Sequence, residues 1–248
     1  MCHSDESRPP RPHLAGVAAD AHELRLTAAD GTRVLAHAAT PQKPNGRGVV
    51  ILPDVRGLHG FYRELAVIFA EAGFHAVAID YFGRTAETDD RDGPSFDWQP
   101  HIKQVTPDMV ATDVRAAVEH LRSLDADRPD AIFTVGFCFG GSASWRQSAE
   151  GHGLAGCIGF YGGQPMERVG PWIPEMEAPL LMLLAGVDST PPEEFAEFAD
   201  AVRRQGVEVQ SYTYAGAPHS FFDRSFAEHG EACADAWQRI LEFTGVAG

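Results

Sequence analysis

The stretch Ala131-Ile132-Phe133-Thr134-Val135-Gly136-Phe137-Cys138-Phe139-Gly140-Gly141 decides how this chain is interpreted. A run of β-branched and aromatic residues leads to a cysteine between glycines, and a helix-compatible segment follows it. This order fits the nucleophile elbow, a sharp strand-to-helix turn of pattern G-x-S-x-G, with cysteine in place of serine. Gly136 and Gly140 would let the backbone pass close to itself in that turn. We therefore predict that Cys138 is a nucleophile at the tip of a strand.

The other cysteines do not share this context. A single cysteine after a strand is more often a small buried hydrophobe than a nucleophile, and we interpret Cys157 and Cys233 as core residues of that kind. For Cys138, the flanking glycines and the partners described below favour catalysis. The four cysteines of the chain form no CxxC pair and no zinc-ligand spacing. The sequence therefore predicts neither a disulfide framework nor a metal site.

Composition limits the class of protein. The chain has 248 residues, of which 44% are hydrophobic, which is enough for one α/β domain with a full core. We predict a flexible Pro-rich arm over residues 1–20 and a single domain over residues 21–248. A net charge of −15 argues against nucleic acid or an anionic membrane surface as partner. Without a long apolar run or a signal-peptide core, we expect a cytoplasmic protein, and we expect a monomer.

Apolar runs alternate with amphipathic segments along the chain. The pair Asp30-Gly31 between two alternating runs predicts a β-hairpin over residues 22–40. Thr106 is a predicted helix N-cap, and Thr190-Pro191-Pro192-Glu193 fits a capping box. Residues 81–106 lose periodicity and predict a long surface loop, with a lid role left open. Predicted strands cover residues 48–53, 74–80, 131–137, 156–161, 180–184 and 207–214, and predicted helices residues 65–72, 106–124, 142–149, 193–202 and 226–243. The alternation predicts an α/β fold with a doubly wound, mostly parallel sheet.

Two further polar residues follow predicted strands, where ligands bind in such sheets. Asp188 comes after strand 180–184 and His219 after strand 207–214. The order Cys138, Asp188, His219 is that of the α/β-hydrolases. An imidazole can take the thiol proton, and an acid on its other nitrogen fixes the tautomer. We expect the backbone N–H groups of Phe139 and Val55 to bind the developing oxyanion.

Three motifs together carry a family resemblance. They are Gly136-Phe137-Cys138-Phe139-Gly140-Gly141, Gly186-Val187-Asp188 and Gly216-Ala217-Pro218-His219-Ser220-Phe221, and with them the chain resembles the dienelactone hydrolase family from about Val34 to its end. The resemblance implies a cofactor-free α/β-hydrolase of one domain, with Cys138 as nucleophile, His219 as base and Asp188 as orienting acid. The reference activity of that family is carboxymethylenebutenolidase activity, which opens the lactone ring of dienelactone.

The resemblance also implies roles outside the triad. Family members carry an acid, usually glutamate, that contacts the resting thiol, and Asp54 matches it with a side chain one methylene shorter. Tyr161 matches a tyrosine that borders the family's pocket. The dienelactone-cleaving enzymes hold a substrate carboxylate with arginines. Arg224 is the nearest match to one of them, and Trp98 and His101 occupy the loop that would carry the other.

We therefore expect hydrolysis of a small ester or lactone through an acyl-cysteine intermediate. Two alternatives stay open at this point. One is a general carboxylesterase or thioesterase with the same triad but no role in aromatic catabolism. The other is a thiol sensor on the hydrolase fold, in which Cys138 reacts without turnover. A burst of product without sustained turnover would favour the sensor.

Overall fold

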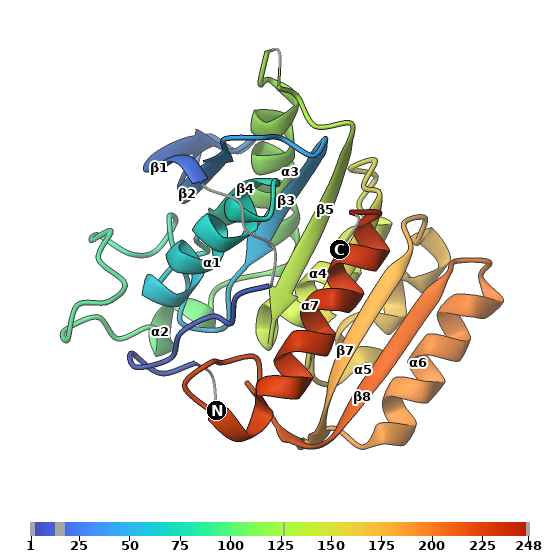
Figure 1. The fold of residues 1–248 in the computed structure, drawn as a ribbon. Coiled ribbons are helices and arrows are strands. Elements are labelled where there is room, and N and C mark those ends of the chain that lie inside the picture. The colour runs from blue at the N-terminus through green and yellow to red at the C-terminus, as the bar shows by residue number, and fades with distance from the viewer. Residues whose placement is uncertain (1–2, 13–17, 126, 247–248) are drawn as a thin grey trace.

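The computed structural model describes residues 3–12, 18–125 and 127–246, and within them it contains one eight-stranded sheet (Figure 1). The strand order is β1-β2-β4-β3-β5-β6-β7-β8. The pairs β1–β2 and β2–β4 are antiparallel, and every other pair is parallel. The strands are β1 (Ala18–Thr27), β2 (Arg33–Pro41), β3 (Arg47–Leu52), β4 (His75–Ile79), β5 (Ala131–Phe137), β6 (Gly156–Phe160), β7 (Leu180–Val187) and β8 (Val209–Pro218). The predicted α/β class and mostly parallel sheet are confirmed.

Helices cover both faces of this sheet (Figure 1). The α-helices are α1 (Gly60–Glu71), α2 (Gln99–Ile102), α3 (Pro107–Arg122), α4 (Phe139–Arg146), α5 (Pro165–Arg168), α6 (Pro192–Arg204) and α7 (Gly230–Thr244). Short 3-10 helices are η1 (Gln147–Ala149), η2 (Gly170–Glu175) and η3 (Ala227–His229). Helices α1 and α7 pack on one face, and α3, α4 and α6 on the other. Buried strands between two helical layers explain the continuous apolar runs in the sequence.

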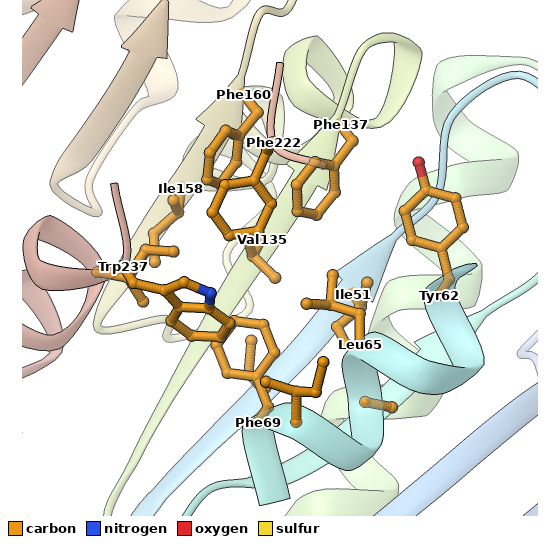
Figure 2. Close-up of a cluster of buried hydrophobic side chains, with 14 of the residues drawn as sticks. Ile51, Tyr62, Leu65, Phe69, Val135, Phe137, Ile158, Phe160, Phe222 and Trp237 are labelled. Atoms are coloured by element: carbon orange, nitrogen blue, oxygen red, sulfur yellow. The ribbon is translucent and has the colours of Figure 1, made fainter. Parts of the chain in front are cut away.

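Alternate residues of the central strands pack into two hydrophobic cores, one on each face of the sheet. In β3, Ile51 packs toward α1 and α7, whereas Val50 packs toward α3. Figure 2 shows the first of these clusters, where Leu65 of α1 and Trp237 of α7 meet Ile51 and Val135 of the sheet. Because successive strand side chains point to opposite faces, this double burial fixes the register of the central strands. The site at their carboxyl ends is thus carried on rigid elements.

Of the two predicted helix caps, the structure confirms the one at Thr106 and contradicts the one at Thr190. Thr106 caps α3 as predicted, because its Oγ1 accepts a hydrogen bond from the Met109 N–H at 3.3 Å. The capping box at Thr190 is wrong: α6 has Pro191 at its N-cap, with no side-chain cap bond. The Thr190 hydroxyl instead accepts the Gln164 N–H at 3.1 Å, which ties it to the start of α5. A tertiary contact has replaced the local one.

The edges of some elements also differ from expectation. Strands β7 and β8 end later than the predicted residues 184 and 214, at Val187 and Pro218. The short helices α5 and η2 were not predicted. Within the predicted loop 81–106, α2 forms one turn, and Arg91 makes a buried ion pair with Asp80 at 2.8 Å. The loop is therefore anchored to the end of β4.

The N-terminal segment, defined here as residues 3–12, is packed against the domain. His3 and Ser7 are buried, and the Trp237 Nε1–H donates to the Pro10 carbonyl at 2.8 Å. This segment of the predicted arm over residues 1–20 therefore buries side chains against the domain. Pro9 and Pro10 are buried, and the hydrogen bond of Pro10 to Trp237 ties the segment to α7. Residues 18–20 belong to β1, and residues 1, 2 and 13–17 lie outside the described part.

Membrane-spanning segments were searched for among the described residues. No helix there is both long and apolar enough to cross a bilayer.

Candidate active site

Cys138 lies in a turn with an unusual backbone conformation. Its φ of 57° and ψ of −115° are rarely adopted by residues other than glycine, and such strain occurs mainly at functional sites. A Cβ on Gly136 would lie 1.8 Å from the Gly140 carbonyl oxygen. A Cβ on Gly140 would lie 2.1 Å from the Leu52 carbonyl oxygen. The two glycines are therefore required by the close approach of β5, α4 and the end of β3.

The elbow sets the surroundings of the thiol. Cys138 precedes α4 directly, and its own N–H donates to the Phe160 carbonyl of β6 at 3.1 Å. The positive end of a helix dipole, directed at a thiol, favours the thiolate over the neutral form. Phe139 is the first residue of α4, a position whose N–H has no acceptor within the helix. This amide therefore fits the predicted oxyanion donor.

The second predicted donor, Val55, belongs to the loop that follows β3. The carbonyls of Leu52 and Pro53 approach the Cα of Gly140, so the end of β3 abuts the turn after Cys138. Val55 follows two residues later in the same loop. This proximity fits an oxyanion hole formed by the elbow and the loop after β3. The role of the Val55 N–H as its second donor stays a prediction.

Asp188 and His219 are brought together by the pairing of β7 and β8. The register shifts after Ala185, so that Val187 pairs with Pro218. The His219 N–H donates to the Val187 carbonyl at 3.2 Å, and His219 Nδ1 lies 2.7 Å from Asp188 Oδ2. The other carboxylate oxygen of Asp188 accepts the Ser189 N–H at 2.6 Å. Asp188 is thus held in place by main-chain contacts and directed at the imidazole.

These contacts change the protonation of both partners. Burial would lower the pKa of His219, but the hydrogen bond with Asp188, followed by that with Cys138, outweighs burial and raises it to about 9. Burial would likewise raise the pKa of Asp188, but the hydrogen bond and charge of His219 lower it overall. The imidazole is thus a strong base, and the carboxylate stays ionised at neutral pH.

Cys138 differs from the other cysteines that the structure describes. Burial raises the pKa of Cys157 to about 12 and that of Cys233 to about 11. Cys138 is half-buried instead, and it contributes to the hydrogen bonding of His219. This confirms the interpretation of Cys157 and Cys233 as buried core residues.

Cys138, Asp188 and His219 line one cleft of about 710 Å³. Its lining includes Val187 and Phe226, large hydrophobic residues that are 60% and 41% exposed. The N-terminal segment contributes His3 to the lining. Among the residues described by the structure, no group of three His, Cys, Asp or Glu side chains is placed to hold a metal ion.

Asp54 is fully buried beside the site. Its carboxylate accepts the His3 N–H at 3.2 Å and the Arg56 N–H at 2.8 Å, and it lies 3.7 Å from His59 Nε2. Burial would raise the pKa of Asp54, but the hydrogen bond and charge of His59, with the charge of His3, lower it. These contacts hold the carboxylate within its own loop and the N-terminal segment. Its contact with the thiol stays a prediction.

Tyr161 lies next to the base. Its ring centroid is 4.8 Å from that of His219, and its hydroxyl is 3.0 Å from His3 Nε2. Like Cys138, Tyr161 has a positive φ, of 37°, at the end of its strand. Tyr161 is fully buried behind the cleft that contains Cys138 and is not among the residues that line it, so its predicted place at the pocket stays a prediction.

The other three predicted pocket residues do not line the cleft that contains Cys138. Arg224 is exposed, and its Nη2 donates to Glu64 of α1 at 2.7 Å. His101 stacks on Phe96 and lines a separate hollow on the 81–106 loop. Trp98 packs on the core beneath α3. Their predicted roles at the substrate pocket therefore stay predictions, and the contacts of each loop determine where these side chains lie.

His3 is a cleft residue that the sequence did not indicate. A histidine near the N-terminus among polar residues and prolines carries no periodicity or motif. Only the folded contacts of the segment show its position.

Comparisons with known proteins show the family of the chain. The model of the dienelactone hydrolase family matches residues 34–247. A protein of Saccharolobus solfataricus named "Putative carboxymethylenebutenolidase" is 25% identical over 251 residues, covering 86% of this chain and 94% of that protein. A Bradyrhizobium protein named "Probable 2-oxo-3-(5-oxofuran-2-ylidene)propanoate lactonase" is 26% identical over 225 residues, covering 86% and 89%.

Solved structures share the fold. The crystal structure of a dienelactone hydrolase-like promiscuous phosphotriesterase from metagenomic libraries matches with a TM-score of 0.73 and 24% identity. The match covers 94% of this chain and all of that chain (100%). At this level of identity the likeness supports the α/β-hydrolase architecture.

Proposed function

The chain belongs to the dienelactone hydrolase family, whose members act on ester or lactone bonds, and from that premise we propose that it works through an acyl-cysteine intermediate on Cys138. One observation carries the proposal. The strained Cys138 and the hydrogen-bonded pair of His219 and Asp188 line the same cleft. Three groups from three strand ends converge there, as nucleophilic catalysis requires.

The proposed reaction has two halves. First the thiol proton passes from Cys138 to His219, whose raised pKa favours this transfer, and the Cys138 sulfur forms a bond to the substrate carbonyl carbon. The carbonyl oxygen becomes an oxyanion that the Phe139 and Val55 amides would bind. When the tetrahedral species collapses, the ester C–O bond breaks and His219 protonates the leaving alkoxide. In a lactone that oxygen remains part of the same molecule.

The second half releases the acid. Water attacks the thioester carbonyl as His219 accepts one of its protons. Collapse breaks the C–S bond, and the proton returns from His219 to the sulfur. Asp188 stays ionised throughout, and its bond to Nδ1 keeps the other ring nitrogen of His219 directed at the reacting atoms.

The lining of the cleft favours an uncharged substrate. Val187 and Phe226 give its rim an apolar character, and no lysine or arginine occurs among the described residues that line it. The predicted carboxylate-binding Arg224 is paired with Glu64 instead. This observation favours a second candidate function, a general carboxylesterase for uncharged aryl or alkyl esters.

The test compares Cys138→Ala with the matched variant Cys157→Ala. Hydrolysis of p-nitrophenyl acetate should fall by orders of magnitude only in the first, and acid-quenched parent enzyme should carry an acetyl group on the Cys138 peptide by mass spectrometry. Turnover that survives in Cys138→Ala would refute the proposal. A stoichiometric burst without further turnover would indicate the thiol sensor. Assays of dienelactone beside neutral aryl esters separate the two hydrolase candidates.

A further inference from the structure

We propose that the N-terminal segment forms one wall of the catalytic cleft and that His3 is a specificity-determining residue that limits the length of the acyl group. The effect of His3 on substrate choice rests on the proposed function, whereas the position of the segment in the cleft wall does not depend on it. His3, Ser4 and Ser7 line the cleft together with Cys138 and His219.

The ring of His3 fills space that would otherwise extend the cleft. It stacks on Phe61 of α1, with ring centroids 3.8 Å apart and planes within 15°. Phe137, the residue before the nucleophile, lies edge-on to it at 6.2 Å. The space under the ring is therefore aromatic and lies directly behind the elbow. Without the His3 ring, that space would suit a longer apolar acyl chain.

Polar contacts fix His3 in this position. Its Nε2 lies 3.0 Å from the Tyr161 hydroxyl, and the Tyr161 ring in turn contacts that of His219. Its N–H donates to Asp54 at 3.2 Å, and its carbonyl accepts from Arg56 Nη1 at 2.7 Å. Both main-chain groups and one ring nitrogen are thus bonded to residues around the catalytic centre.

The rest of the segment is anchored independently of His3. The Arg8 N–H donates to Asp223 Oδ1 at 3.0 Å, and the Arg8 carbonyl accepts the Arg224 N–H at 2.9 Å. Farther along, Pro10 accepts a hydrogen bond from Trp237. Contacts at both ends make the segment part of the cleft wall rather than a loosely attached tail.

The ring acts mainly by occupying volume. Burial lowers the pKa of His3, against the opposing effects of the nearby charges of Asp223 and Asp54, so the imidazole is neutral at physiological pH. A neutral ring stacked on phenylalanine is replaceable by another aromatic ring. This gives a matched pair of variants that separates volume from polarity.

The experiment measures kcat/KM for p-nitrophenyl acetate, butyrate, hexanoate and octanoate with the full chain. His3→Ala should raise the ratio of hexanoate to acetate by roughly tenfold or more, since each methylene accommodated in an apolar pocket contributes at that scale. His3→Phe keeps the ring and should keep the parent's ratio. Glu6→Ala, an exposed change on the same segment, should leave the whole series unchanged.

A second variant tests the opposite change, a narrower cleft. Ser4 is exposed and lines the cleft, so Ser4→Trp adds bulk without disturbing a core and should shift preference toward acetate. An unchanged chain-length profile in both His3→Ala and Ser4→Trp, with Cys138-dependent turnover retained, would overturn this inference alone. Loss of Cys138 dependence would instead overturn the proposed function.

Discussion

His219 and Asp188 follow two neighbouring parallel strands, and a shift in the strand register brings their side chains to 2.7 Å. The register shift after Ala185 and the hydrogen bond from the His219 N–H to the Val187 carbonyl are both main-chain features. The acid and base are therefore placed by the sheet itself. The first two predictions test what this pairing does.

Replacing the acid should impair the base. Asp188→Asn removes the carboxylate that raises the pKa of His219 and offers the ring a poorer acceptor. We expect kcat/KM for p-nitrophenyl acetate to fall by about 10³-fold or more, as expected when a triad acid becomes an amide. Iodoacetamide should also alkylate Cys138 more slowly at pH 7. Asp200→Asn, which changes an exposed acid on α6, is the control and should change neither rate.

The pairing should also make stability depend on pH. The pKa of His219 is raised from 6.5 to about 9, so folding favours its protonated form. The resulting stabilisation is fully present below about pH 6.5 and is lost as the pH rises through 9. The difference in unfolding free energy between parent and His219→Gln should therefore shrink across that window. Urea unfolding at several pH values checks this, and a pH-independent difference would contradict it.

The elbow glycines should tolerate no side chain. Gly136→Ala would place a Cβ against the Gly140 carbonyl, and we expect it to lower the free energy of unfolding by about 3 kcal/mol or more. Gly230→Ala is the matched control, because a Cβ there meets nothing within 4 Å and the residue begins a helix. That change should stay within about 1 kcal/mol and favour folding. Equal effects of the two variants in urea melts would show that the elbow is not constrained.

The buried pair of Asp80 and Arg91 should hold the 81–106 loop. Arg91 Nε and Nη2 lie 3.1 and 2.8 Å from the carboxylate, and both side chains are buried. Arg91→Met leaves an uncompensated buried charge, so we expect a loss of about 3–5 kcal/mol. Arg25→Met, which breaks an exposed pair with Asp89, should cost about 1 kcal/mol or less. Hydrogen exchange in the loop should accelerate only in the first variant.

Much of the fold could be predicted because its signals are local. The short, continuous apolar runs of β3 to β6 are typical of strands in a parallel sheet that is buried on both faces. The glycine spacing around Cys138 reflects contacts within a few residues of the turn. The order of Cys138, Asp188 and His219 then followed from the strand ends, and the structure brings the three together in one cleft.

Features that depend on distant partners were not predictable in this way. The hydroxyl of Thr190 could cap α6 or bind Gln164, and only the packed chain decides between them. Arg224 lies near the expected sequence position, but Glu64 of α1 determines where its guanidinium lies. His3 reaches the catalytic centre from more than 130 positions away through contacts with Asp54 and Tyr161. Local sequence patterns do not indicate such contacts between residues that are far apart in the chain.

The docked N-terminal segment has a practical consequence for anyone who handles this enzyme. An affinity tag fused ahead of His3 would begin at the cleft and compete with substrate for its mouth. A tag placed after Thr244 would begin at the far end of α7, away from the start of that helix near the N-terminal segment (Figure 1). Kinetic constants from the two tagged forms should therefore not be interchanged. The position of the affinity tag should therefore be stated with every kinetic constant.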